Sequence, residues 1–136
     1  MIFKNKLKPT KELKRLISQR ATNDFMSHFR KTQEEIDAFK DLPKLNSGLV
    51  YDYKTTLYLR GKSVAPHIDE DFIEAKVVRS MFWVTKKKTQ HPIYLQVGHE
   101  YAHIGQYDFA VFDDSILHSV SSDGEWEGIA IQCGAD

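Results

Sequence analysis

The residues in this 136-residue chain most able to do chemistry are six histidines, at positions 28, 67, 91, 99, 103 and 118. One arrangement combines His67-Ile-Asp69 with His118, far downstream. In an extended strand, residues i and i+2 point to the same side, so His67 and Asp69 can meet one ion. Two imidazoles and one carboxylate on one side of a metal leave open coordination positions opposite, where other ligands can bind. His67, Asp69 and His118 are therefore a candidate metal site, although HxD alone often occurs by chance.

A second arrangement, HEYAH at 99–103, matches the pattern HExxH. On a helix, His99 and His103 would lie about 6 Å apart on one face and hold zinc, with Glu100 as the general base of a peptidase. The runs before and after this segment alternate like strands, which favours a strand here with Gly98 in a hairpin turn. In a strand the two histidines would be about 13 Å apart and could not share an ion. The zinc peptidase is therefore the less favoured interpretation.

The first forty residues are expected to be helical. A helix can begin at Thr10, with Leu13 and Ile17 on one face. Asn23 can cap a second short helix that carries Met26, and a capping-box pattern further on predicts a third helix. These helices would form a basic segment over 1–43.

From residue 45 the sequence consists of short β-rich runs separated by turn residues such as Gly61, Gly98 and Gly105. The runs are 49–53, 55–60, 76–84, 92–97, 99–104, 107–112 and 127–133. Strands at this close spacing indicate an antiparallel sandwich or barrel and not βαβ units. We therefore predict a single α+β domain, mainly β, in which the helices pack on a β-core over 45–134.

The composition excludes several classes of protein. Hydrophobic residues make up 41% and charged residues 28% of the chain, which is ordinary for a globular domain. No apolar run approaches the ~20 residues of a membrane span, and no apolar secretory segment follows Met1, so we expect a cytoplasmic protein with no membrane partner. The single cysteine, Cys133, excludes a disulfide framework and a Cys-rich zinc site. Any metal must therefore bind to histidines and carboxylates.

The formal net charge of zero hides an asymmetry. Residues 1–40 carry ten Lys or Arg and five Asp or Glu, whereas residues 41–136 carry nine and fourteen. The simplest interpretation is that basic helices dock on an acidic β-body or expose a solvated polar face. A protein or nucleic-acid partner for the basic helices is the alternative.

Two segments, TTLYLRGKSVAPHIDEDF at 55–72 and HEYAHIGQYDFAVFDDSILHSV at 99–120, together resemble the Fe(II)/2-oxoglutarate-dependent dioxygenases. The fold of that family is a cupin-type double-stranded β-helix, or jelly roll. The resemblance implies that His67, Asp69 and His118 are iron ligands and that Fe(II) and 2-oxoglutarate are cofactors. The implied reaction is hydroxylation or demethylation of an unknown substrate.

The resemblance also implies residues that bind 2-oxoglutarate. Tyr58 occupies a place where a tyrosine often helps to bind this cosubstrate. The family usually has an Arg or Lys on the last strand for the far carboxylate, but residues 121–136 contain neither. Some relatives use a basic residue on the strand after HxD, which KVVRSMFWV at 76–84 resembles.

Three basic residues are candidates for this anchor: Lys76, Arg79 and Arg60. Arg79 is preferred because it sits among apolar residues in the middle of a predicted strand, where a guanidinium needs an anionic partner. The missing last-strand cation keeps a further interpretation open, which is a non-catalytic cupin-like binding module.

Overall fold

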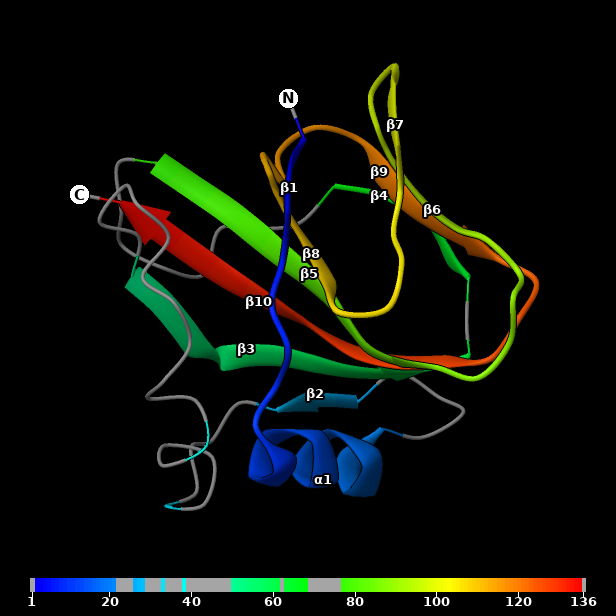
Figure 1. Ribbon diagram of the computed structural model, residues 1–136. Helices are drawn as coiled ribbons and strands as arrows, with labels where there is room; N and C mark the ends of the chain where they lie inside the picture. Colours follow the sequence, from blue (N-terminus) through cyan, green and yellow to red (C-terminus); the bar gives the residue numbers. More distant parts are fainter. Residues whose placement is uncertain are drawn as a thin grey trace.

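The computed structural model describes residues 2–21, 26–28, 33, 38, 50–61, 63–68 and 77–135. Within these residues the chain is mainly β, with ten strands and one helix (Figure 1). The elements are β1 (Phe3–Lys6), α1 (Lys11–Arg20), β2 (Met26–His28), β3 (Val50–Arg60), β4 (Val64–His67), β5 (Val77–Lys87), β6 (Ile93–Val97), β7 (Glu100–His103), β8 (Asp108–Phe112), β9 (His118–Ser122) and β10 (Trp126–Ala135).

The strands form two antiparallel sheets. The larger sheet has the order β1-β8-β5-β10-β3-β2, and the smaller has the order β4-β9-β6-β7. From β3 to β10 the chain passes repeatedly from one sheet to the other, and only β6 and β7 follow each other within a sheet. In Figure 1 the smaller sheet lies to one side of the diagonal strands of the larger sheet. This winding brings strands distant in sequence side by side.

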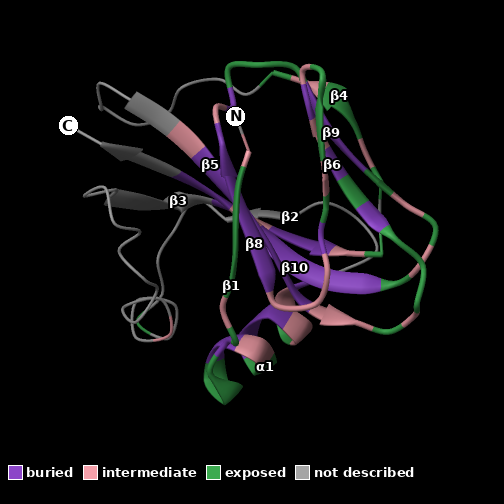
Figure 2. Ribbon diagram, turned by 45° about the horizontal axis from the view of Figure 1, so that its top comes forward, coloured by how far each residue is buried: buried purple, intermediate pink, exposed green. Residues whose placement is uncertain are grey.

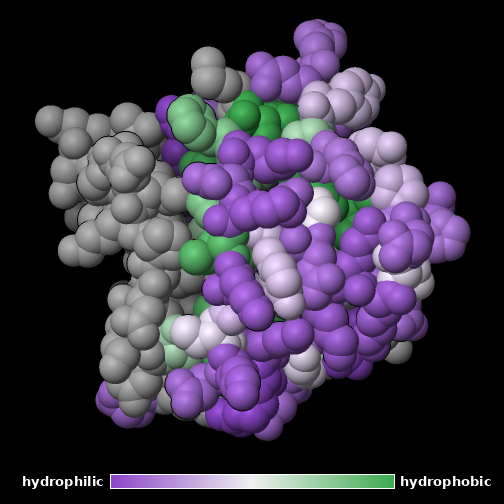
Figure 3. Space-filling model, in the orientation of Figure 1, coloured by the Kyte–Doolittle hydropathy of each residue, from purple (hydrophilic) through white to green (hydrophobic). Residues whose placement is uncertain are grey.

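The buried apolar residues fall into two clusters on opposite faces of the larger sheet. Successive side chains in a strand point to opposite faces, so neighbours in β5 belong to different clusters. Phe82 lies between the two sheets, whereas Trp83 faces α1. Figure 2 shows the buried residues running along β5, β8 and β10, at the centre of the larger sheet. The face of the described part seen in Figure 3 is covered mostly by hydrophilic side chains.

Helix α1 lies on the outer face of the larger sheet. Thr10 is its N-cap, and the Thr10 hydroxyl accepts a hydrogen bond from the backbone N–H of Leu13 at 3.2 Å. Leu13 and Ile17 are buried in the cluster on that face, so the predicted helix from Thr10 is confirmed. At the far end, Ser18 donates a hydrogen bond to the buried carboxylate of Glu127 in β10.

Two other predictions for the N-terminal segment are wrong. Phe3–Lys6 is strand β1, which pairs with β8, and Met26–His28 is strand β2, which pairs with β3. Short segments have little helical stability of their own, and the edges of a sheet offer open backbone hydrogen-bonding groups. Pairing with a strand at the edge of the sheet therefore gives both segments an extended conformation. The third predicted helix lies largely outside the described residues.

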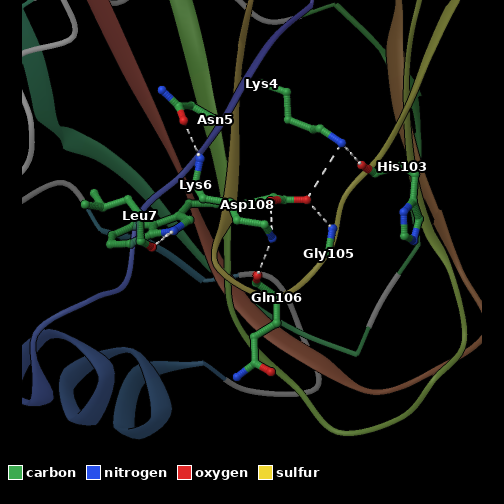
Figure 4. A network of polar contacts seen from close by, with 9 residues as sticks. Lys4, Asn5, Lys6, Leu7, His103, Gly105, Gln106 and Asp108 are labelled. Atoms are coloured by element: carbon green, nitrogen blue, oxygen red, sulfur yellow. Dashed lines mark hydrogen bonds and ion pairs between the residues drawn. The ribbon is translucent and has the colours of Figure 1, made fainter.

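Strand β1 is also held to the β-body by a buried carboxylate (Figure 4). The Asp108 side chain lies 2.8 Å from the Lys6 ammonium and 3.9 Å from that of Lys4, and it accepts a hydrogen bond from the N–H of Gly105 at 2.7 Å. Burial alone would raise the pKa of Asp108. The hydrogen bonds from Lys6 and Gly105, with the charges of Lys6 and Lys4, outweigh it and lower the pKa below its ordinary value of 3.8.

This lowered pKa makes the stability of the fold depend on pH. Asp108 stabilises the folded state above its unfolded pKa, and the contribution is lost as the pH falls through the lower folded pKa. Asp108→Asn is therefore expected to cost about 1 kcal/mol at pH 7 and less at pH 3, as measured by urea unfolding. Asp123→Asn, at an exposed position, is the matched control. An equal loss for Asp108→Asn at both pH values would contradict the expectation.

Candidate functional site

Strands β4 and β9 bring two of the predicted site residues together. His67 and His118 are direct partners in the antiparallel pairing of these strands, and their ring centroids lie 4.3 Å apart. Neither strand is among the β-rich runs identified in the sequence, because β4 contains Pro66 and β9 is rich in serine. The HxD pattern for His67 and the resemblance of 99–120 to the oxygenases for His118, and not strand propensity, pointed to this pair.

Both imidazole rings are fixed by the backbone. The Nδ1 atom of His67 lies 2.7 Å from the carbonyl oxygen of Ala65, and that of His118 lies 2.7 Å from the carbonyl oxygen of Ile116. A carbonyl oxygen can only accept, so each Nδ1 donates its proton, and in the neutral imidazole each Nε2 then carries the lone pair. Metal-binding histidines have this arrangement, in which a hydrogen bond from one nitrogen orients the other.

The histidines line a cavity between the two sheets. Its volume is about 50 Å³, which is space for a few water molecules or for an ion with a small ligand. His118 is only 5% exposed, and its ring lies 4.9 Å from that of Phe112. The other lining residues are mostly apolar: Leu57, Leu59, Val64, Ser80, Phe82, Leu95, Ser119, Val120 and Ala130. The pair of imidazoles is therefore the main polar feature of the described part of the lining.

Asp69, the third predicted ligand, lies outside the described residues. Within the part of the chain that the structure describes, no group of three His, Cys, Asp or Glu side chains is placed to hold a metal ion. The described residues thus assemble the two imidazoles of the predicted site, and the carboxylate stays a prediction.

The structure does not bring Tyr58 to this cavity. Leu57 and Leu59 of β3 line the cavity, so strand alternation turns Tyr58 to the opposite face of the sheet. There Tyr58 is fully buried in the cluster that contacts α1, and the Arg20 guanidinium lies 6.0 Å from the centre of its ring. Tyr58 therefore does not line the cavity that holds the two histidines, and its contact with an oxo acid stays a prediction.

By the same alternation along a strand, Arg79 lies on the outer face of the larger sheet. It precedes Ser80, which lines the cavity, and its guanidinium lies 3.9 Å from the Asp113 carboxylate. Of the other two candidates, Arg60 pairs with Glu127 at 3.0 Å, and Lys76 lies outside the described residues. Neither described candidate reaches the histidine cavity.

The HEYAH segment is a turn and a strand, as its flanking residues predict. Gly98 has a φ of 59°, in the left-handed region suited to a turn, and Glu100–His103 is strand β7. Glu100 accepts a hydrogen bond from the backbone N–H of Ile2 at 2.9 Å, and the His103 ring lies 5.7 Å from that of Tyr94. The helix that an HExxH zinc site requires is not formed.

Sequence reasoning missed a buried polar group behind the cavity. Asp114 is 3% exposed, and its carboxylate accepts a hydrogen bond from the Ser80 hydroxyl at 2.8 Å and one from the Gln132 amide at 3.4 Å. Ser80 and Gln132 are partners in the pairing of β5 with β10. In the sequence Asp114 follows another aspartate in a turn, and nothing in that pattern distinguishes it from an exposed loop residue.

Comparisons with known proteins do not assign this site. No protein-family model matches the sequence, and a search of curated proteins finds no match. In the described part of the chain, no helix has the length and apolar character needed to cross a membrane. The functional argument therefore rests on the geometry of the chain itself.

Proposed function

We propose that this chain is a small double-stranded β-helix protein that binds Fe(II) through His67, Asp69 and His118. We further propose that it is a non-haem oxygenase that hydroxylates or demethylates its substrate. The observation that carries the proposal is the pair of imidazoles in β4 and β9, whose Nδ1 atoms are both bonded to backbone carbonyls. Such a pair brings two oriented imidazole rings together at the cavity between the two sheets.

The order of the strands supports the fold in this proposal. In a jelly roll, eight strands form two facing antiparallel sheets, and the chain crosses between them. Strands β3 to β10 form two such sets of four, β8-β5-β10-β3 and β4-β9-β6-β7. In this interpretation β1 and β2 are additions at the two edges of the larger sheet.

The residues of the chain would hold and shield the metal. Hydrogen bonds to Ala65 and Ile116 orient the two imidazoles before any ion binds, which lowers the cost of assembling the site. The ring of Phe112 packs beside His118, and the apolar walls limit the water that reaches the cavity. Fe(II), when bound, supplies the positions at which dioxygen and a chelating ligand bind.

2-Oxoglutarate does not fit the described lining of the cavity. The second carboxylate of this cosubstrate needs a cation, because a charge buried without a partner is costly. The described residues that line the cavity include no Lys or Arg, and Arg79 and Tyr58 face the other side of the sheet. The same observation favours the second candidate function, a non-catalytic cupin-like module that binds a metal or a small ligand.

Metal titration tests the proposal. The purified chain, stripped with a chelator, is expected to bind about one Fe(II) or Mn(II) per molecule under anaerobic conditions, measured by calorimetry. Ligands that bind only the native state stabilise it, so the melting temperature is expected to rise with metal concentration. Absence of metal binding would overturn the metal site. Oxygen uptake by the Fe(II)-loaded protein with a 2-oxo acid would favour the oxygenase, and metal binding without uptake would favour the binding module.

A further inference from the structure

We propose that the outer face of strands β6 and β7, together with a row of lysines from β1 and α1, binds single-stranded nucleic acid. The bases stack on the aromatic rings of the sheet, and the phosphates lie against the lysines. None of these side chains belongs to the described lining of the histidine cavity, so this surface is independent of the metal site.

Three rings share the outer face of the smaller sheet at its open edge. Tyr94 is the partner of His103 in the pairing of β6 with β7, and Tyr101 lies two residues from His103, so their side chains point the same way. The other face packs in the core through Leu95, which is fully buried. Tyr94 is 44% exposed and Tyr101 is 69% exposed. Exposed rings on a protein surface are the platform on which unpaired bases stack.

The groups around these rings are small or polar. Ser121 of β9 is the partner of Tyr94 in the pairing of β6 with β9, and it is exposed. Gln96 is the partner of Tyr101 and shares the outer face with it. Hydroxyl and amide groups can form hydrogen bonds with the edges of a stacked base. A membrane-binding surface would instead present aliphatic and other strongly apolar side chains, so this face favours bases over lipid.

A row of ammonium groups leads from this face toward α1 (Figure 4). The Nζ atom of Lys4 donates a hydrogen bond to the carbonyl oxygen of His103 at 3.0 Å, next to the aromatic face. The Nζ atom of Lys6 donates one to the carbonyl oxygen of Gln106 at 3.4 Å. The Nζ atom of Lys14 lies 5.9 Å from the ring centre of the tyrosine that follows Gln106. Three cations therefore follow one another along the loop between β7 and β8.

Few carboxylates offset the charge of this row. Residues 3–14 contain five lysines, and Glu12 is their only acid. Lys4 and Lys6 share the single carboxylate of Asp108. Within the described part of the chain, the other three lysines of this segment form no ion pair. The row thus keeps a positive charge that phosphate groups can neutralise, with release of their counterions.

Fluorescence anisotropy with a labelled oligothymidine of about twelve nucleotides tests this surface. The metal-free chain at low salt is expected to bind it with a dissociation constant of about 1–100 µM. Three contacted phosphates predict that the affinity falls with salt, with a slope of about −2 on logarithmic axes. A duplex of the same length is expected to bind more weakly, because its bases are already paired and are not free to stack.

Substitutions separate stacking from charge. Tyr101→Ala is expected to weaken binding about five- to a hundredfold, the range for loss of a stacking ring, whereas Tyr101→Phe keeps the ring and should stay within about twofold. Lys14→Gln should weaken binding several-fold and make the salt slope shallower by about 0.7. Lys88→Gln makes the same change of charge in the turn after β5 and is the matched control. It should leave the affinity and the slope unchanged.

Absence of oligothymidine binding, or equal binding by the native chain and Tyr101→Ala, would overturn the inference. Equal binding of the duplex would also overturn it, because charge alone would then account for the attraction. Binding of vesicles that contain phosphatidylserine, without binding of the oligonucleotide, would assign the surface to a membrane instead. A melting curve for each variant establishes that it is folded. Metal titration is a separate measurement, so failure of the metal site and failure of this inference are distinguished.

Discussion

Replacing His118 by alanine is expected to weaken metal binding by at least about a hundredfold. Loss of a group that only orients a metal ligand already costs about 10–100-fold, so loss of the ligand itself should cost more. The ring of His118 is almost fully buried, lies 4.3 Å from that of His67, and is oriented by the Ile116 carbonyl. His67→Ala should have an effect of similar size, because His67 is the direct partner of His118 in the pairing of β4 with β9 and its ring is oriented by a carbonyl in the same way. Calorimetric titration with Mn(II) gives both affinities.

His103→Ala is the matched control for this expectation. His103 is exposed in strand β7, and its ring lies beside that of Tyr94 and not beside the histidine pair. Its removal should leave the metal affinity within about twofold of the native value, which is also the test of the HExxH interpretation. Loss of metal binding in His103→Ala but not in His118→Ala would contradict the proposed site. Melting curves recorded with a chelator separate loss of affinity from loss of folding.

The candidate site was predictable from the sequence only in part. The HxD pattern indicated His67 and the resemblance to the oxygenases indicated His118, and these two imidazole rings lie 4.3 Å apart. The residues expected to bind the oxo acid are placed on the other face of the larger sheet. Tyr58 is flanked by Leu57 and Leu59, and either face of such an apolar strand could have been the inner one. Tyr58 packs in the cluster that includes Leu13 and Ile17 of α1, and this long-range contact is not encoded in the sequence of the strand itself.

The fold shows the same division between local and long-range information. Thr10 and the spacing of Leu13 and Ile17 predicted α1, because capping and helical periodicity act within a few residues. Strand β1 could not be predicted in this way, because the basic, weakly apolar segment is extended by pairing with β8, about a hundred positions away in the chain. Strands β4 and β9, which carry the histidines, are likewise extended because they pair with neighbouring strands.

The second large effect is expected at the two tryptophans, which fill opposite faces of the larger sheet. Trp83 faces α1 and Trp126 lies between the sheets, each no more than 1% exposed. Alanine at either position is expected to lower the free energy of unfolding by about 3–5 kcal/mol, because it removes buried apolar area and leaves a cavity. Urea unfolding followed by circular dichroism measures both losses.

Substitution of each tryptophan by phenylalanine distinguishes the contributions of the two indole N–H groups to stability. The Nε1 atom of Trp83 donates a hydrogen bond to the Leu7 carbonyl at 3.1 Å, whereas that of Trp126 is buried and makes no hydrogen bond within the described residues. Trp83→Phe loses this bond, but Trp126→Phe removes a polar group that is costly to bury. Trp126→Phe is therefore expected to be less destabilising by about 1–3 kcal/mol. Equal losses would mean that the bond to Leu7 makes no net contribution.

The two alanine variants also test whether loss of core packing changes binding at the cavity. Trp126 packs edge-on against Phe82, with ring centroids 5.4 Å apart, and Phe82 forms part of the cavity wall. Trp126→Ala would let Phe82 move away from the cavity that the two histidines line, so we expect weaker binding of Mn(II), measured by calorimetry under conditions where the variant is folded. Trp83→Ala, with a similar stability cost on the other face, should leave this affinity unchanged. An equal change in both variants would indicate that general loosening of the fold, and not the position of Phe82, controls the cavity.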